Sequence, residues 1–377
     1  MDIAEIRWWS YRVPFRHSFT TAHGLLTVRE GIIVQITTAQ DVSGTGEIAP
    51  LPAFAGGSLA DARSLLPEVA ARLHGKNLDE ALALLLTWNE AQPSPARSTP
   101  LLSGLESALL DVAGKAEGCS VSTLLSPADA VPRTAVEVNA VIGAQTAEAA
   151  ATAAQAFRHN RFNCVKLKVG LAADMQEEVE RVAAVREAIG PSMQLRLDAN
   201  EAWTLEEAIA ILSHCIPYNI QYVEQPLPAH DLAAMRALRQ AVPVPIAADE
   251  ALHGPQSARH VLESEAADIL VIKPQLAGGL RAARSVVQMA AERGVRSVIT
   301  GTIETGVGLV AALHLAAATP AITLACGLAT LPLLIDDFVV NDLTVRNGLL
   351  TVPAGPGFGI TLDREALEKY SLRDYEL

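Results

Sequence analysis

From residue 133 onward, short apolar runs alternate with longer segments in which apolar side chains recur every three or four residues. The short runs have the length and β-branched content of strands, and the longer segments have the period of amphipathic helices. Because the two kinds alternate with no intervening hairpin, the pattern favours an α/β fold, a closed (β/α) barrel of the TIM type. An open doubly wound sheet is the alternative, but no G-x-G-x-x-G motif follows an early strand. Strands are expected at 136–142, 164–169, 194–198, 220–224, 244–248, 268–273, 296–300 and 322–326.

Helix-period segments separate these runs and begin at residues that commonly cap helices. Helices are expected, for example, at 146–158, 174–189, 205–215, 231–241 and 279–293.

The first 125 residues have a different pattern. Two strand-like runs, 6–13 and 31–38, flank a polar segment at 16–21, and a loop rich in glycine and proline follows at 46–57. Strands followed by helices are typical of an α+β module. Helical patterns then cover 58–73, 78–90 and 101–117.

The C-terminal tail returns to short strands and turns, at 349–353 and 355–359, and is expected to rejoin the first module. We therefore expect two domains. An α+β capping domain comprises residues 1–128 and is completed by 329–377, and the catalytic barrel comprises 129–328.

Composition limits the class of partner. The 377 residues suit a barrel of roughly 200–250 residues plus a second module. A formal net charge of −13 argues against nucleic acid or an anionic membrane surface. The apolar stretch 307–335 is interrupted by Gly, His and Pro, which favours a buried helix and strand over a membrane span. The N-terminus does not have the pattern of a signal peptide, and four widely spaced cysteines are expected to be reduced in a cytoplasmic protein.

Charged residues occur where the barrel pattern calls for apolar ones. In the run 164–169, Val165 and Leu167 share one face of the strand, so Lys166 and Lys168 share the other and are expected to point into the barrel. By the same alternation Asp198 and Asn200 are expected to point inward at the end of the next strand.

Five successive strand ends carry such a charge, and they are separated by 30, 26, 25 and 24 residues, each one βα unit. The charges are therefore expected to converge on the carboxyl face, where barrel enzymes have their active sites. For any one of them, a solvated charge at a strand-to-loop junction is the alternative. The five are Lys168, Asp198, Glu224, Asp249 and Lys273.

Three of these five are acidic, and burying three carboxylates together is costly unless a cation neutralises them. Oxygen ligands from separate strands suit Mg²⁺, with Mn²⁺ as a substitute, whereas the absence of His and Cys from these positions disfavours zinc. The predicted ligands are Asp198, Glu224 and Asp249.

The lysines complete a site for removing a proton from carbon. A base must be neutral, and a neighbouring lysine, a cation and partial burial are each expected to lower a lysine pKa. Lys168, closest to the strand end, is the expected base, and Lys166 is expected to tune it. Lys273, across the barrel, is expected to supply either a second acid or base or a fixed positive charge. A carbon acid beside a carboxylate would give an enediolate on deprotonation.

These residues resemble the enolase superfamily, and more narrowly its muconate-lactonizing-enzyme branch. The branch has a K-x-K strand end, matched by Lys166 and Lys168, a lysine after the sixth strand, matched by Lys273, and three acidic Mg²⁺ ligands at the positions given above. The resemblance covers essentially the whole chain and implies a modified, enolase-like barrel with a capping domain. Further matching motifs are Gly46-Glu47, residues 105–111 and residues 356–359.

Within the branch, the segments 47–52, 138–140 and 326–330, with Asp336-Asp337, look most like o-succinylbenzoate synthases. That resemblance implies a lyase reaction of menaquinone biosynthesis, the syn-dehydration of 2-succinyl-6-hydroxy-2,4-cyclohexadiene-1-carboxylate to o-succinylbenzoate. It also implies that Lys168 removes the proton alpha to the carboxylate and that Lys273 faces the ring as a cation.

Other residues are expected beside the metal or the substrate. Packing is the alternative for Ser18 and Phe54, and a role at a helix N-terminus is the alternative for Glu304. His314, on an apolar helix, is expected to be a satisfied core or surface histidine. The candidates are Asn139, Asn200, Glu250, Gly301, Thr302, Glu304, Ser18 and Phe54.

Four alternatives stay open. N-succinylamino acid racemases and muconate-type cycloisomerases use the same machinery. Dipeptide epimerases do so too, but they have an Asp-x-Asp pair after the eighth strand, where this chain has Ala325-Cys326-Gly327-Leu328. A barrel with a binding role only is the fourth alternative. The expected partner is a small carboxylate substrate, and association into homo-oligomers stays open.

Overall fold

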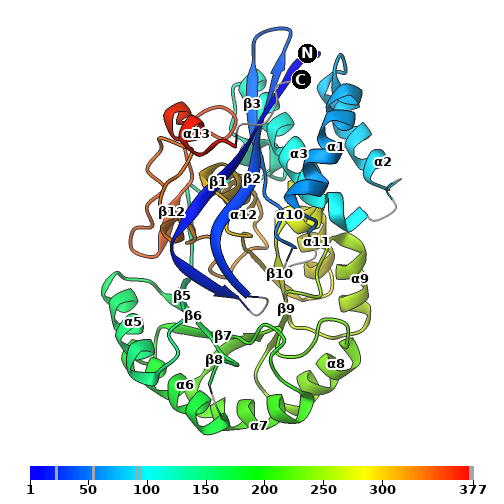
Figure 1. Ribbon diagram of the computed structural model, residues 1–377. Coiled ribbons are helices and arrows are strands. Elements are labelled where there is room, and N and C mark those ends of the chain that lie inside the picture. The colour runs from blue at the N-terminus through cyan, green and yellow to red at the C-terminus, as the bar shows by residue number, and fades with distance from the viewer. Residues whose placement is uncertain (22–23, 53–55, 91, 93–94, 173, 373–377) are drawn as a thin grey trace.

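A curled sheet of seven parallel strands runs through the middle of the chain in the computed structural model, which describes residues 1–21, 24–52, 56–90, 92, 95–172 and 174–372 (Figure 1). The spatial order β11-β10-β9-β8-β7-β6-β5 follows the order along the chain, so each strand pairs with the next, as in a barrel. The predicted barrel-type fold is confirmed. The strands are β5 (Ala140–Ile142), β6 (Cys164–Lys168), β7 (Gln194–Asp198), β8 (Ile220–Glu224), β9 (Ile246–Ala248), β10 (Ile269–Ile272) and β11 (Arg296–Ile299).

The prediction of an eighth strand at 322–326 is wrong, because this segment forms no strand. Cys326 forms a parallel bridge with Val138 at one edge of the sheet, and Gly327 forms one with Thr300 at the other edge. Because the chain changes partner between two consecutive residues, neither edge gains the successive pairs that make a ladder. These two bridges nevertheless join both edges, and we call them the seam of the barrel.

Helices lie around the outside of the sheet, with α5 to α9 following one another from its left, along its lower side and up its right side in Figure 1. All five predicted barrel helices begin within one residue of the predicted position. In four of them the N-cap side chain accepts a backbone N–H three residues on, and these N-caps are Thr146, Asp174, Thr204 and Asp231. The helices of this part are α5 (Ala147–His159), α6 (Met175–Ile189), α7 (Leu205–Cys215), α8 (Leu232–Ala241), α9 (Pro255–Glu263), α10 (Pro274–Ala277), α11 (Leu280–Ala291) and α12 (Gly306–Ala318).

The N-terminal part forms an antiparallel sheet in the order β1-β2-β3, which packs against α3. In Figure 1 this sheet and its helices lie above the barrel, and the paired ends of β1 and β2 reach down toward it. The elements are β1 (Ile3–Thr21), β2 (Gly24–Thr38), β3 (Ser43–Ile48), α1 (Leu59–Leu73), α2 (Leu78–Glu90), α3 (Pro95–Glu117) and α4 (Val121–Leu125).

Two predicted loops belong partly to this sheet. The polar segment 16–21 was predicted to separate two strands, but β1 continues to Thr21 after a register shift that follows Pro14. Likewise the predicted loop 46–57 begins only after Ile48, since residues 46–48 pair with β2. In both places backbone pairing with a neighbouring strand forms an element that the side-chain pattern does not show.

The C-terminal tail returns to the N-terminal part. The backbone of Gly357 bridges Ser120, and Ser371, after α13 (Arg364–Tyr370), bridges Tyr11. The strand β12 (Leu349–Thr351) has a different partner: it pairs with β4 (Ala135–Glu137), the first half of the predicted strand 136–142. The domain boundaries at 128 and 328 stay predictions.

Three apolar clusters form the core. One lies between the barrel sheet and its helices, one lies beneath the N-terminal sheet, and a small third one fills the barrel interior. The third cluster includes Tyr222, Ile269, Val271 and Val298, so the barrel is packed beneath its carboxyl end. In the described part of the chain, no helix is both long and apolar enough to cross a membrane.

Candidate active site

The strand register brings the charged strand ends side by side. Lys168 on β6 pairs with Asp198 on β7, and Asp198 pairs in turn with Glu224 on β8. Because parallel strands in register present equivalent faces, these three side chains enter the barrel at the same level. One layer deeper, Lys166 lies opposite Arg196.

Two lysines bind this row of carboxylates. Lys168 Nζ donates to Asp198 Oδ2 and to Asn200 Oδ1, both at 2.7 Å. Lys166 Nζ lies 2.8 Å from the same Asp198 oxygen and 2.7 Å from Glu224 Oε1. Asn200 continues the network by donating to Glu250 Oε1 at 2.8 Å. Lys168 is 24% exposed and Lys166 only 11%, so Lys168 is the more accessible of the two.

A second ion pair stands on the neighbouring strands. Lys273, which follows β10, donates to both carboxylate oxygens of Asp249, at 2.6 Å to Oδ2. Both side chains are buried. Lys273 is also the N-cap residue of α10, since its carbonyl accepts from the amides of Leu276 and Ala277. We call Lys166, Lys168, Asp198, Glu224, Asp249 and Lys273 the strand-end cluster.

Burial and mutual repulsion act on the carboxylates of the cluster. Burial raises the pKa of Glu224 to about 7, and the nearby charges of Asp198 and Asp249 add to this effect. Burial also acts to raise the pKa of Asp198, but the ammonium groups of Lys166 and Lys168 outweigh it and leave that pKa below its ordinary value.

The pKa values of Lys166 and Lys273 move in the direction opposite to the one expected from the sequence. Burial acts to lower the pKa of Lys166, but Asp198 and Glu224 outweigh it and hold that pKa well above its ordinary value. For Lys273, Asp249 and Glu250 likewise outweigh burial and raise the pKa. The physical reason is that each ammonium group is paired directly with carboxylate oxygens.

The cluster has the composition of a magnesium site. Two carboxylate oxygens, Glu224 Oε2 and Glu250 Oε2, are buried and accept no hydrogen bond from any described residue. Buried anionic oxygens without donors are costly, and a hard divalent cation would satisfy them. Among the described residues no group of three His, Cys, Asp or Glu side chains already stands in a metal-binding arrangement, because the lysines hold the carboxylates. The donor set fits Mg²⁺ with Asp198, Glu224 and Asp249 as the candidate ligands.

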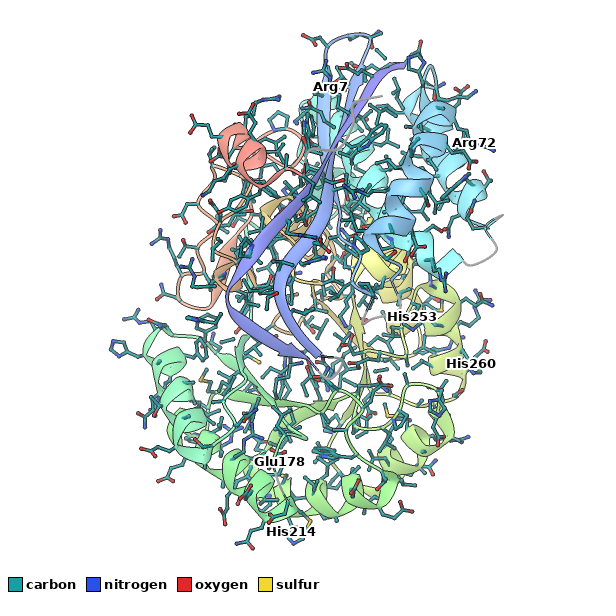
Figure 2. The ribbon with its side chains drawn as sticks, viewed as in Figure 1. Arg7, Arg72, Glu178, His214, His253 and His260 are labelled. Atoms are coloured by element: carbon teal, nitrogen blue, oxygen red, sulfur yellow. The ribbon has the colours of Figure 1, made fainter. Side chains whose placement is uncertain are left out.

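A buried ion pair that sequence reasoning missed holds the end of β6. Arg181 on α6 pairs with Glu178, and its Nη2 donates to the carbonyl of Lys168 at 2.8 Å. Glu178, labelled in Figure 2, accepts the amide of Gly170 at 2.6 Å. Gly170 has a φ of 76°, a conformation that favours glycine, so the chain can turn back directly after the strand. The spacing of Glu178 and Arg181 on one helix face was the available signal.

Arg196 and Gln225 were also not predicted as site residues from the sequence. The guanidinium of Arg196 is fully buried, lies 4.7 Å from the ring centroid of Tyr222, and donates to the Ala325 carbonyl at 2.7 Å. Gln225 has a φ of 36° and its side-chain oxygen accepts the Asp249 amide at 3.0 Å. Arg196 therefore forms part of the floor beneath the cluster, and Gln225 fixes the backbone of one candidate ligand.

The remaining predicted residues lie apart from the lysine network. Asn139 accepts from Arg196 Nη1 at 3.1 Å, below the strand-end cluster. On the loop after β11, Thr302 and Glu304 are buried, and Glu304 turns back to accept from the amide and hydroxyl of Thr302. Gly301 lies on the same loop and its amide donates to the Gly327 carbonyl across the seam.

Two predicted residues cannot be placed in the same way. Ser18 lies on β1, but its side chain is outside the described part of the structure, and Phe54 lies outside the described residues altogether.

An open hollow of about 810 Å³ lies elsewhere, between α5 and α6 on the outside of the barrel. It is lined by residues such as Gln155, Arg158 and Glu187 and contains none of the strand-end cluster. The chemistry of the cluster therefore identifies the candidate active site better than the size of a hollow does.

Comparisons with known proteins identify relatives of this chain. Residues 148–366 match the family model described as enolase C-terminal domain-like, and residues 3–86 match the model described as the MenC N-terminal domain. The L-Ala-D/L-Glu epimerase of Bacillus subtilis is 30% identical over 96% of this chain and 97% of its own. The o-succinylbenzoate synthase of Thermobifida fusca is 40% identical over 58% of this chain and 67% of its own.

Solved structures show the same similarity. The muconate lactonizing enzyme of Pseudomonas fluorescens, complexed with muconolactone, has a TM-score of 0.90 at 25% identity and covers 98% of this chain and 99% of its own. The dipeptide epimerase of Cytophaga hutchinsonii, complexed with Mg and the dipeptide D-Ala-L-Val, has a TM-score of 0.89 at 26% identity, with 98% of each chain covered.

Proposed function

The chain belongs to the enolase superfamily and, within it, to the muconate-lactonizing-enzyme subgroup, and from this membership we propose that it is an o-succinylbenzoate synthase. Members of the group are metal-dependent enzymes, and the proposal concerns which reaction this chain catalyses. The reaction is the syn-dehydration of 2-succinyl-6-hydroxy-2,4-cyclohexadiene-1-carboxylate to o-succinylbenzoate.

The observation that carries the proposal is the arrangement of three lysines around buried carboxylates. Lys166 and Lys168 stand on one strand, and Lys273 stands four strands farther along the sheet. Such an arrangement can place a base on one side of a small ring and a cation on the other. The match of residues 3–86 to the MenC N-terminal domain, and the 40% identity to the T. fusca synthase, support dehydration over the other reactions.

In the proposed reaction Lys168, in its neutral form, removes the proton alpha to the substrate carboxylate. The C–H electron pair then forms the new ring double bond as the 6-hydroxyl group leaves, so that water is released and the ring becomes aromatic. Because the elimination is syn, both groups depart from one face, and the ammonium of Lys168 is the proton donor available to the departing hydroxyl. Lys273 provides a cation toward the ring, and Lys166 adds fixed positive charge next to Asp198.

A divalent cation, which the family neighbour from C. hutchinsonii binds as Mg, would supply positive charge for the substrate carboxylate oxygens as negative charge builds up there. Asp198, Glu224 and Asp249 would hold it. The Asn200 side-chain amide links Lys168 to Glu250, the residue after Asp249.

Epimerisation of a dipeptide, or racemisation of an N-succinylamino acid, is the second candidate. The 30% identity to the B. subtilis epimerase along nearly the whole chain favours it. The segment 325–328 argues against a dipeptide substrate, because it has no carboxylate at the seam that could bind a substrate amino group. Muconate-type cycloisomerisation uses the same machinery and is the third reaction to assay.

The deciding experiment compares substrates on one protein preparation. We expect turnover of the cyclohexadiene substrate with Mg²⁺, and loss of that turnover in EDTA that is restored by added Mg²⁺. In parallel, N-succinylamino acids, dipeptides and muconate are incubated in D₂O and followed for α-deuterium incorporation or lactone formation. Racemisation or epimerisation with no turnover of the cyclohexadiene would replace the proposed reaction by the second candidate.

A further inference from the structure

Helices α11 and α12 begin differently from α5 to α8. The N-cap residues of α5 to α8 accept backbone amides of their own helix, whereas those of α11 and α12, Gly279 and Thr305, make no such bond. In α11 and α12, carboxylates from the N-terminal part of the chain accept the first backbone amides instead. Glu106 on α3 accepts the Arg281 amide at 3.3 Å, and Glu47 on β3 accepts amides at the start of α12.

Glu47 is held by four donors. Its Oε1 accepts from the Thr305 amide at 3.0 Å and from the Tyr11 hydroxyl at 2.5 Å. Its Oε2 accepts from the Thr305 hydroxyl at 2.6 Å and from the Gly308 amide at 2.8 Å. The side chain is 1% exposed, and the N-terminus of α12 offers the partial positive charge that favours a buried carboxylate. A Cβ at position 308 would stand 3.0 Å from Glu47 Oε2, so glycine allows this close approach.

Arg29 joins the same two parts of the chain. Its guanidinium donates to the Ile303 carbonyl at 2.9 Å and to the carbonyls of Ala49 and Pro50 at 2.6 and 2.9 Å. Ile303 has a φ of 63°, which costs a β-branched residue on the order of 1–3 kcal/mol and persists only where the surroundings hold it. Contacts from β2 and β3 therefore hold the loop between β11 and α12, residues 300–305, in one conformation.

This loop borders the strand-end cluster. Ile299 at the end of β11 pairs with Ile272, the residue before Lys273. The loop then presents Thr300, Gly301 and Thr302 at the carboxyl end of the sheet, while Glu304 is turned back onto Thr302. The loop carries no lysine of the cluster and none of the three candidate metal ligands, so it supplies neither the candidate base nor a candidate ligand.

We propose that Glu47 is a positioning residue for substrate binding, which fixes the loop 300–305 against β3 so that this loop and the N-terminal sheet bind the substrate as one rigid surface. The inference rests on the proposed function to the extent that the carboxyl end of the barrel binds a small carboxylate. It predicts that Glu47 acts on KM through Thr305 and not on the basicity of Lys168.

The test separates KM from kcat in purified full-length variants. In Glu47→Gln, the amide group faces donors that need an acceptor, so we expect KM to rise about tenfold or more while kcat changes less than about threefold. Mg²⁺ affinity should stay unchanged. Thr305→Val removes the hydroxyl that donates to Glu47 Oε2 and should raise KM similarly. Because both substitutions act on one contact, the KM of the double variant should be no higher than that of either single variant. Thr305→Ser keeps the hydroxyl and should have the wild-type KM.

The matched control is Asp111→Asn. Asp111 is also fully buried and accepts two backbone amides, those of Thr45 and Phe358, with Lys115 as its charged partner. It should lose stability with KM unchanged. All assays are run well below the melting temperature of each variant. They use whichever substrate the wild type turns over. If that substrate is a dipeptide, the proposed dehydration is rejected, and the role of Glu47 in substrate binding is still tested. A KM within twofold of wild type in both Glu47→Gln and Thr305→Val, or an equal rise in Asp111→Asn, overturns the proposal. Thr305→Val carries the test if Glu47→Gln does not fold.

Discussion

At the scale of single residues, two lysines two positions apart have different surroundings. Lys166 is bonded to two carboxylates and is nearly buried, whereas Lys168 is bonded to one carboxylate and one amide and is more exposed. The period-2 alternation of a strand was enough to predict that both point inward. Their pairing with Asp198 depends on the register between β6 and β7, which no local pattern specifies.

Replacing Lys168 tests its role as base. Lys168→Ala should lower kcat by about 10²–10⁴-fold, the usual contribution of a general base, and should abolish α-proton exchange with D₂O. Mg²⁺ binding, followed by calorimetry, should persist because the candidate ligands remain. Lys76→Ala, at an exposed position in the N-terminal part, serves as the control and should be fully active. Residual turnover within tenfold of wild type would remove Lys168 from the mechanism.

His314 is a second residue whose surroundings predict a measurable property. It is fully buried on α12, accepts the Ser122 amide at Nδ1 and lies 3.2 Å from the Phe358 carbonyl at Nε2. Neutral imidazole with its proton on Nε2 satisfies both contacts. Burial lowers the pKa of His314 to about 4.

The stability consequence has a definite sign. The unfolded chain takes up a proton near pH 6.5 that the folded chain excludes until about pH 4, so this contribution is complete above pH 6.5 and is lost as the pH falls. Over that window the loss reaches about 3 kcal/mol at about 1.4 kcal/mol per pKa unit. Urea unfolding at pH 7 and pH 4.5 should show a smaller pH-dependent loss in His314→Gln than in the wild type. The exposed His214, replaced by Gln, should leave the wild-type loss unchanged.

At the scale of elements, local chemistry predicted the helices better than the strands. Helix starts carry their signal in one residue, as Thr204 shows: its hydroxyl accepts the Glu207 amide while the Glu207 carboxylate accepts the Thr204 amide. Strands depend on partners far away in sequence. Such pairings extend β1 to Thr21 and leave 322–326 with only the two bridges of the seam. The apolar pattern of 322–326 did not reveal this, because it is the same as that of a full strand.

The capping box of α7 gives a prediction at this scale. Thr204→Ala removes the hydroxyl that accepts the Glu207 amide, while the backbone amide of residue 204 can still donate to Glu207, and should lower the free energy of unfolding by about 1 kcal/mol. Thr87→Ala is the matched control, because Thr87 is exposed within α2 and its hydroxyl bonds only carbonyls of its own helix. Chemical denaturation of both variants measures the difference. Equal stability of the two would show that the box does not stabilise α7.

At the scale of the whole molecule, three carboxylates from three strands and two lysines on a fourth meet at one end of the barrel. Their convergence was predictable, because each charge stands one βα unit after the last. The return of the tail was predictable only in part: the backbone of Gly357 and Ser371 does bridge the N-terminal part, but β12 pairs with β4. A three-residue strand has too little pattern of its own to specify a partner.

Metal removal tests the carboxylate cluster as a unit. Mg²⁺ that binds the folded protein alone should stabilise it by about 2.7 kcal/mol at a hundred times its Kd, and EDTA should reverse the effect. Thermal unfolding with and without Mg²⁺ should therefore show a shift in wild type that disappears in Glu224→Gln. A shift of equal size in that variant would place the metal elsewhere.

Because Glu47 of β3 accepts the amides at the start of α12, parts of related proteins cannot be recombined freely at this contact. A chimera that joins this barrel to the N-terminal sheet of another protein keeps the threonine at 305 but inherits whatever residue the new sheet has at the place of Glu47. Where that residue is not an acceptor, the start of α12 presents buried amides with nothing to satisfy them, and the loop beside it loses its support. Grafting for new specificity would therefore succeed more often when both ends of that contact are exchanged together.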